Sequence, residues 1–168
     1  MKPKNNKKTK DSTSSNSRVR IVHVSDIHLF HARNPTKEIL DKLRLQLFQQ
    51  DADLVLFGGD IFDNLATLSV DSIWDVFAFA KDLIKWAEET RTLIRILKGT
   101  PRHDWKQNRI FASTALSMGS ELLVCKDDLE IEHIAELGID ILYIPDEYRP
   151  TTAETWQAVV VLLKNTSL

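Results

Sequence analysis

Short apolar runs alternate with longer amphipathic segments along the first part of the chain. Residues 21–24, 53–57 and 93–97 form three runs that are rich in branched side chains. Runs of this length are typical of strands buried in a parallel sheet. Between them, apolar residues recur at helical spacing over 35–50 and 70–87. The order strand, helix, strand, helix, strand predicts an α/β fold with a mostly parallel sheet and flanking helices.

Capping residues mark where both helices are expected to begin. Asn34 precedes Pro35, which combines a capping side chain with the residue preferred at the first helical position. Ser69 is the predicted cap of the second helix, with Asp71 in its first turn. The apolar stripe of this second helix is interpreted as core packing rather than as a partner surface.

The pattern changes after the third run. Residues 101–108 are polar and predict a loop, and residues 109–118 predict a short helix. Three further candidate strands follow, separated by Lys126-Asp127-Asp128 and by Gly138, and they are interpreted as a C-terminal meander: 121–125, 129–133 and 139–144. Thr151 or Thr152 then opens a last amphipathic helix.

Composition separates a basic tail from an acidic body. The chain has 168 residues, 43% hydrophobic and 27% charged, which suits one globular domain. Residues 1–20 carry seven Lys and Arg against one acid, although the net charge of the whole chain is −2. We expect a disordered tail over 1–18 and one domain over 19–168. The tail is either a basic arm that touches nucleic acid or a solubilising leader.

The single cysteine and the hydropathy of the chain bear on its disulfides, its metal sites and its cellular location. Cys125 is the only cysteine, so an internal disulfide and a cysteine-based zinc site are both excluded. The basic tail lacks the apolar core of a secretory signal, and no stretch approaches the roughly 18 apolar residues of a membrane span. These features predict a cytoplasmic protein that does not cross a membrane.

Acids and histidines follow the three apolar runs, where the carboxyl ends of parallel strands form a ligand-binding edge. Asp26 and His28 flank one residue and leave an extended segment on the same face, and Asp60 follows the second run. Such a set suits a divalent transition metal such as manganese, iron or zinc. His103 is expected to act as a general acid or to stabilise the transition state, and Asp104 to orient it.

Each of these residues also has an ordinary structural interpretation. A lone Asp26 or Asp60 often caps a turn, and a lone His28 is usually a solvated loop residue. The combination of three such groups, each at the end of a predicted strand, favours a metal site.

These residues form blocks that resemble the calcineurin-like metallophosphoesterase superfamily. The blocks are Asp26-Ile27-His28, Gly59-Asp60-Ile61-Phe62-Asp63 and Gly99-Thr100-Pro101-Arg102-His103-Asp104. The residues of the first two blocks are similar to those of the DNA-repair and recombination exonuclease branch, whose members pair with a coiled-coil ATPase. The third block and Tyr143-Ile144-Pro145-Asp146-Glu147 are similar to a bacteriophage version of that branch. The resemblance covers 19–164, the front half of a family member.

The resemblance implies a fold, an activity and roles for individual residues. The fold would be a partial α/β/β/α sandwich, to which this chain contributes one sheet and part of its covering. The activity would be manganese-dependent phosphodiester hydrolysis in DNA, by an exonuclease or endonuclease. Asp26, His28 and Asp60 would hold metal, and His103 would assist with Asp104 beside it. The implied partners are DNA, a coiled-coil ATPase subunit and a second copy of the chain.

Two departures from the family pattern predict weakened or absent catalysis. Arg102 stands before His103, where the family places an asparagine ligand, and a guanidinium offers no lone pair to a second cation. No histidine follows His133, so the three C-terminal histidines of the family are missing. Two alternatives therefore stay open. The chain is either a non-catalytic module that binds nucleic acid or an ATPase, or one half of a nuclease completed by another polypeptide.

Overall fold

The fold is described by a computed structural model over residues 18–33, 35–66 and 72–166. The predicted basic tail up to residue 17 and the predicted caps Asn34 and Ser69 lie outside these described residues.

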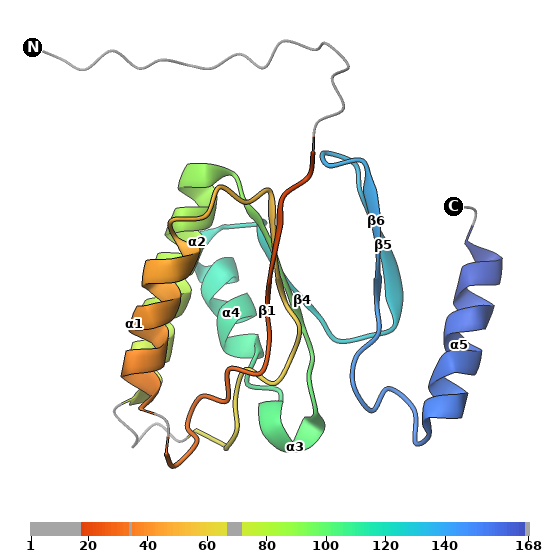
Figure 1. Cartoon of the computed structure of the whole chain (residues 1–168), viewed down its shortest axis with the longest axis horizontal. Helices are drawn as coiled ribbons and strands as arrows, with labels where there is room; N and C mark the ends of the chain where they lie inside the picture. The colour runs from red at the N-terminus through yellow and green to blue at the C-terminus, as the bar shows by residue number, and fades with distance from the viewer. Residues whose placement is uncertain (1–17, 34, 67–71, 167–168) are drawn as a thin grey trace, which may run out of the picture.

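A four-stranded parallel sheet forms the centre of the molecule (Figure 1). Its strands are adjacent in the order in which they occur in the chain: β1 (Ile21–Val24), β2 (Leu54–Phe57), β3 (Leu93–Leu97) and β4 (Leu123–Lys126). Every neighbouring pair is parallel. The three apolar runs of the sequence are therefore confirmed as neighbouring strands, and their carboxyl ends share one edge of the sheet.

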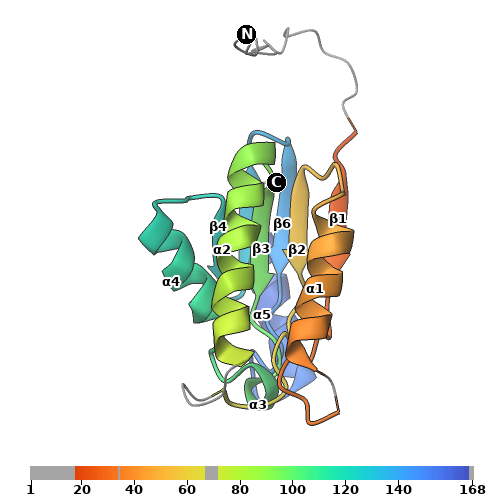
Figure 2. The ribbon, with the colours of Figure 1, turned by 90° about the vertical axis from the view of Figure 1, so that its left-hand side faces the viewer.

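Three helices cover one face of this sheet: α1 (Thr36–Leu47), α2 (Ser72–Thr90) and α4 (Arg109–Met118) (Figure 2). Alternate strand residues such as Val55, Phe57, Ile94 and Ile96 turn toward these helices and are fully buried. Burial of each such side chain contributes about 2 kcal/mol. This face holds the main hydrophobic core, as the amphipathic patterns predicted. No helix in the described part of the chain has the length and apolarity needed to cross a membrane.

The predicted meander is wrong in its first strand. β4 pairs in parallel with β3 rather than with the strands that follow it. The reason is the connection before it, because α4 provides a helical crossover of the kind that joins parallel strands. The predicted polar loop over 101–108 also contains the single-turn helix α3 (Pro101–Asp104), which begins with proline.

A hairpin and a last helix lie on the other side of the sheet. β5 (Glu130–Ile134) and β6 (Ile139–Tyr143) are antiparallel and form a separate two-stranded sheet. Beyond them lies α5 (Thr152–Asn165), which Thr151 caps by accepting a hydrogen bond from the backbone of Glu154. Figure 1 shows the resulting order of layers, helices, sheet, hairpin and helix. This is the partial α/β/β/α sandwich that was expected.

Polar side chains join the hairpin to the central sheet. Glu132 of β5 accepts hydrogen bonds from Arg95 of β3, with Nη2 to Oε1 at 2.7 Å, and from Tyr143 of β6 at 2.9 Å. Lys126 Nζ of β4 lies 3.1 Å from the same carboxylate. Burial by itself would raise the pKa of Glu132, but these three partners outweigh it and lower the pKa to about 2. A charged clamp therefore holds the second sheet in place.

Candidate metal centre

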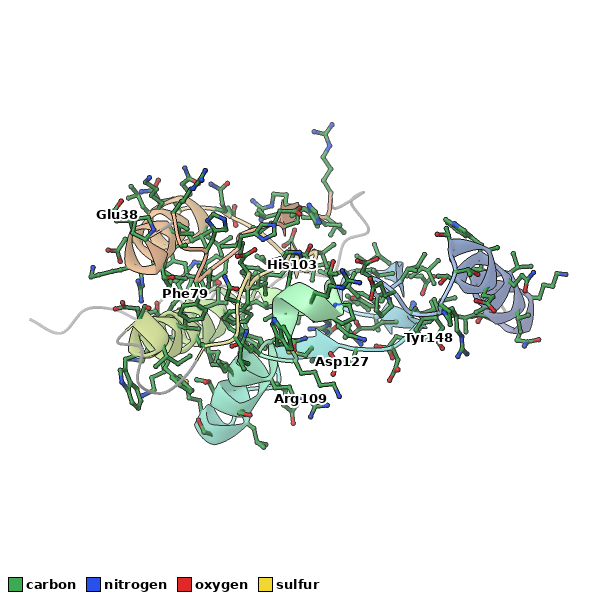
Figure 3. All side chains as sticks on the ribbon, turned by 90° about the horizontal axis from the view of Figure 1, so that it is seen from below. Glu38, Phe79, His103, Arg109, Asp127 and Tyr148 are labelled. Atoms are coloured by element: carbon green, nitrogen blue, oxygen red, sulfur yellow. The ribbon has the colours of Figure 1, made fainter. Side chains whose placement is uncertain are left out.

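The loops after β1, β2 and β3 meet at the carboxyl edge of the sheet. Hydrogen bonds continue the parallel pairing beyond the strands, from the Asp26 amide to the Gly59 carbonyl at 3.3 Å and from the His28 amide to the Asp60 carbonyl at 3.1 Å. Figure 3 views this edge from below and places His103 between Phe79, on the helical side, and Tyr148, on the hairpin side. Segments distant in sequence thus form one site.

Asp26, His28 and Asp60 come together as the sequence predicted. One potential ligand atom from each lies within 4.8 Å of the others. The closest approach of His28 Nε2 to Asp26 is 3.9 Å, to the Oδ1 atom. Two carboxylates and one imidazole are a donor set that suits a divalent first-row metal. The residues present therefore fit the cation that the sequence pattern implied.

The backbone of all three residues is in the left-handed region. The φ angles are 54° at Asp26, 52° at His28 and 50° at Asp60. This conformation is uncommon outside glycine and costs roughly 1 kcal/mol or more per residue. Strain of this kind gathers where surrounding structure fixes functional side chains. Five other non-glycine residues share this conformation, so it is the convergence of the side chains, rather than the backbone alone, that marks these three positions.

Asp63 lies beside both imidazoles of the site. Its Oδ1 atom lies 3.3 Å from His28 Nδ1 and 3.2 Å from His103 Nδ1. The two rings are nearly perpendicular, with centroids 5.0 Å apart. A carboxylate on one ring nitrogen of a histidine fixes the tautomer that leaves the other nitrogen free for a metal. Asp63 had no predicted role, although it lies three residues after Asp60 in the second sequence block.

His103 reaches the same place from α3. Its Nδ1 atom is buried and, among the described residues, has no hydrogen bond of acceptable geometry despite its closeness to Asp63. The side chain as a whole keeps 36% exposure. The ring is therefore partly exposed to a ligand, and its Nδ1 atom has no hydrogen bond among the described residues.

Asp104 lies behind the site and holds its loops together. Its carboxylate is fully buried and accepts hydrogen bonds from the Phe62 amide at 3.1 Å and the Gly99 amide at 2.8 Å. Burial raises the pKa of Asp104 above its usual value, and these backbone bonds oppose the rise. We expected Asp104 to orient His103, but the carboxylate beside that imidazole is Asp63, because α3 turns the Asp104 side chain toward the loop after β2.

Thr100 occupies the position next to Asp60. Its amide donates to Asp60 Oδ1 at 2.7 Å, and its hydroxyl lies 3.2 Å from Asp60 Oδ2 and 2.7 Å from Asp146 Oδ2. Arg102, expected to disturb a second cation here, has an exposed side chain. Neither Thr100 nor Asp146 was assigned a role from the sequence, because their meeting depends on how the loop after β6 returns to the sheet.

The family comparison agrees with this geometry. Residues 19–101 match a family model described as calcineurin-like phosphoesterase. The matched segment contains Asp26, His28, Asp60 and Asp63, and it ends two residues before His103. A search of curated proteins returned no match. Residues 19–101 are thus similar to the calcineurin-like phosphoesterase family, and the layered α/β fold and the convergence of three strand ends are consistent with that similarity.

Proposed function

We propose that the protein is a metal-dependent phosphodiesterase that cleaves DNA. The observation that carries this proposal is the group formed by Asp26, His28 and Asp60, whose ligand atoms lie within 4.8 Å of one another at the carboxyl edge of the sheet. The family match over residues 19–101 supports phosphoester chemistry at this edge. The wording of the first two sequence blocks supports DNA as the substrate.

Asp26, His28 and Asp60 would hold the cation, and their neighbours keep them in place. A divalent metal bound here supplies Lewis acidity and lowers the pKa of water. Asp63 Oδ1 accepts a hydrogen bond from the Nδ1–H group of His28, in the tautomer that leaves the other ring nitrogen for the metal. The Thr100 amide donates a hydrogen bond to Asp60 Oδ1 at 2.7 Å and so fixes this carboxylate. We propose manganese, because the set mixes carboxylate oxygens with an imidazole nitrogen.

His103 is the proton-transfer group of the proposal. Its ring is partly exposed, and Asp63 lies 3.2 Å from Nδ1 and can stabilise the protonated imidazole. A histidine held in this way gives a proton to the oxygen that leaves when a phosphodiester bond breaks.

We expect slow turnover. Three protein side chains are fewer than the four to six donors that first-row metals usually take, which favours weak cation affinity. A separate polypeptide that supplies the family's late histidines would raise that affinity. A coiled-coil ATPase partner and a homodimer also remain predictions from the resemblance.

The test is manganese-dependent hydrolysis of a chromogenic phosphodiester and of single-stranded DNA. Wild type should release product only with added metal, and Asp60→Asn should abolish the release. Asp140→Asn is the matched control, because Asp140 pairs with His133 on the hairpin at 2.7 Å, outside the site. Turnover that survives Asp60→Asn, or that fails to appear at any manganese concentration, contradicts the proposal.

A further inference from the structure

A pocket lies beside the candidate metal centre. It has a volume of about 350 Å³ and lies between the ends of β2 and β3, the loop after β6 and the start of α5. Its lining includes Gly58, Lys98, Asp146, Arg149 and Trp156. Ligand pockets in proteins have volumes from about 300 Å³ upward, so this one is large enough for a single nucleotide unit.

Hydrogen bonds connect the pocket wall to the proposed metal ligands. Gly58 and Lys98 each lie two positions before a residue of the centre, Asp60 and Thr100 respectively. Asp146 Oδ2 in the wall lies 2.7 Å from the Thr100 hydroxyl, which lies 3.2 Å from Asp60 Oδ2. The pocket and the candidate metal centre are therefore adjacent, with Thr100 between Asp146 and Asp60.

The pocket offers two cations and an indole ring. Within the described part of the chain, Lys98 and Arg149 form no ion pair, and the Arg149 guanidinium stacks on Tyr148 at 4.7 Å. Trp156, in the first turns of α5, is 56% exposed. Unpaired cations attract phosphate, and an exposed aromatic ring offers a surface on which a base can stack.

The carboxylate of Asp146 in the pocket wall already contacts other groups of the protein. Asp146 Oδ2 contacts Thr100, and Asp146 Oδ1 accepts a hydrogen bond from the Glu147 amide at 2.9 Å. Both oxygens therefore have protein partners, and the carboxylate is fixed on the side of the metal centre. Glu147 is the remaining acid in the lining, against the two cations and the indole.

We propose that this pocket binds the nucleotide adjacent to the bond that is cleaved, in a single-stranded nucleic acid. Trp156 stacks on its base, and Lys98 and Arg149 contact its phosphate. The strand is single because a base must leave its own stack to lie on the indole. The position relative to the cleaved bond rests on the proposed function, whereas the binding itself does not.

The experiment measures binding of a fluorescently labelled oligothymidylate by anisotropy in EDTA, so that no cleavage occurs. Trp156→Ala should weaken binding about 5- to 160-fold, because stacking of one base contributes about 1–3 kcal/mol. Trp156→Phe should restore most of it. Trp74→Ala is the matched control, since Trp74 lies on α2 with a similar exposure of 60%, and it should bind like wild type.

Charge is tested with the same probe. Arg149→Ala should reduce the slope of log affinity against log salt by about 0.7, the value for one phosphate contact with a single strand. Lys85→Ala, an exposed cation on α2, should leave the slope unchanged.

Several results would contradict the proposal that this pocket binds a nucleotide. One is wild type that does not bind the oligonucleotide, and another is Trp156→Ala that binds as tightly as Trp74→Ala. A third is a Trp156→Ala variant with altered sedimentation but unaltered oligonucleotide binding, which would make this face of α5 a protein interface. Hydrolysis of DNA with binding insensitive to Trp156 rejects the pocket alone. Binding that depends on Trp156 without hydrolysis rejects the proposed function alone.

Discussion

Backbone strain at single residues shapes the candidate metal centre. Asp26, His28 and Asp60 all have left-handed φ angles near 50°, and Gly59, in the loop after β2, has a φ of 98°. Hydrogen bonds from the Asp26 and His28 amides to the neighbouring loop fix this conformation. Holding these side chains in place thus lowers the stability of the fold, as is common at functional sites.

Replacing Asp26 by glycine should separate stability from function. Glycine adopts a φ of 54° without steric cost, and the Asp26 side chain is 70% exposed, so little packing is lost. We expect Asp26→Gly to raise the free energy of unfolding by about 0.5–1 kcal/mol in a urea titration, while manganese binding falls. Asp26→Ala should weaken manganese binding equally without the gain in stability. A loss of stability in Asp26→Gly would show that the conformation is not strained.

Gly99 is required because it has no side chain. A Cβ atom at this position would lie 2.2 Å from the Asp60 amide nitrogen and 2.8 Å from Asp104 Oδ2. Gly99→Ala should therefore displace Asp60, abolish manganese binding and lower the melting temperature. Gly119→Ala is the control for manganese binding, because a Cβ atom at Gly119 meets open space. Its positive φ of 69° strains an alanine, so this variant should lose some stability but keep the manganese affinity of wild type. Equal manganese affinity in Gly99→Ala and wild type would contradict the packing of the two loops.

At the scale of elements, periodicity predicted which segments are helices and strands better than it predicted their partners. The helix over 109–118 and the strand over 93–97 have the bounds that the sequence indicated. β4 was assigned to a meander because an isolated apolar run does not reveal whether it pairs in parallel. The roles of Asp63 and Asp104 were missed for a related reason, since α3 decides which carboxylate faces His103.

The clamp between the two sheets should make stability depend on pH. The pKa of Glu132 is lowered from 4.5 to about 2, so its contribution is complete above pH 4.5 and is lost as the pH falls toward 2. The contribution is about 2–3 kcal/mol. Glu132→Gln should lower the free energy of unfolding at pH 7 by this amount and flatten its decline below pH 4.5.

Glu130→Gln is the control for this clamp. Glu130 also contacts Lys126, at 3.0 Å, but it is 43% exposed and should change stability by less than about 1 kcal/mol. Urea titrations from pH 7 to pH 3 measure both variants. Parallel curves for Glu132→Gln and wild type would show that the carboxylate is not held by Arg95.

At the scale of the whole molecule, the second sheet completes the site as well as the fold. The hairpin and α5 lie across the central sheet from the helices, and the loop between them brings Asp146 to Thr100 (Figure 1). The three strand-end groups could be predicted because parallel strands must end at one edge. The pocket beside them could not, since it arises only when the loop after β6 returns to that edge.

Calorimetric titration of manganese into the purified chain tests the central claim most directly. Wild type should give a saturable isotherm, Asp60→Asn and His28→Ala should give none, and Asp140→Asn should match wild type. Isotherms that are the same for wild type and Asp60→Asn would show that these aspartates and this imidazole do not share a cation.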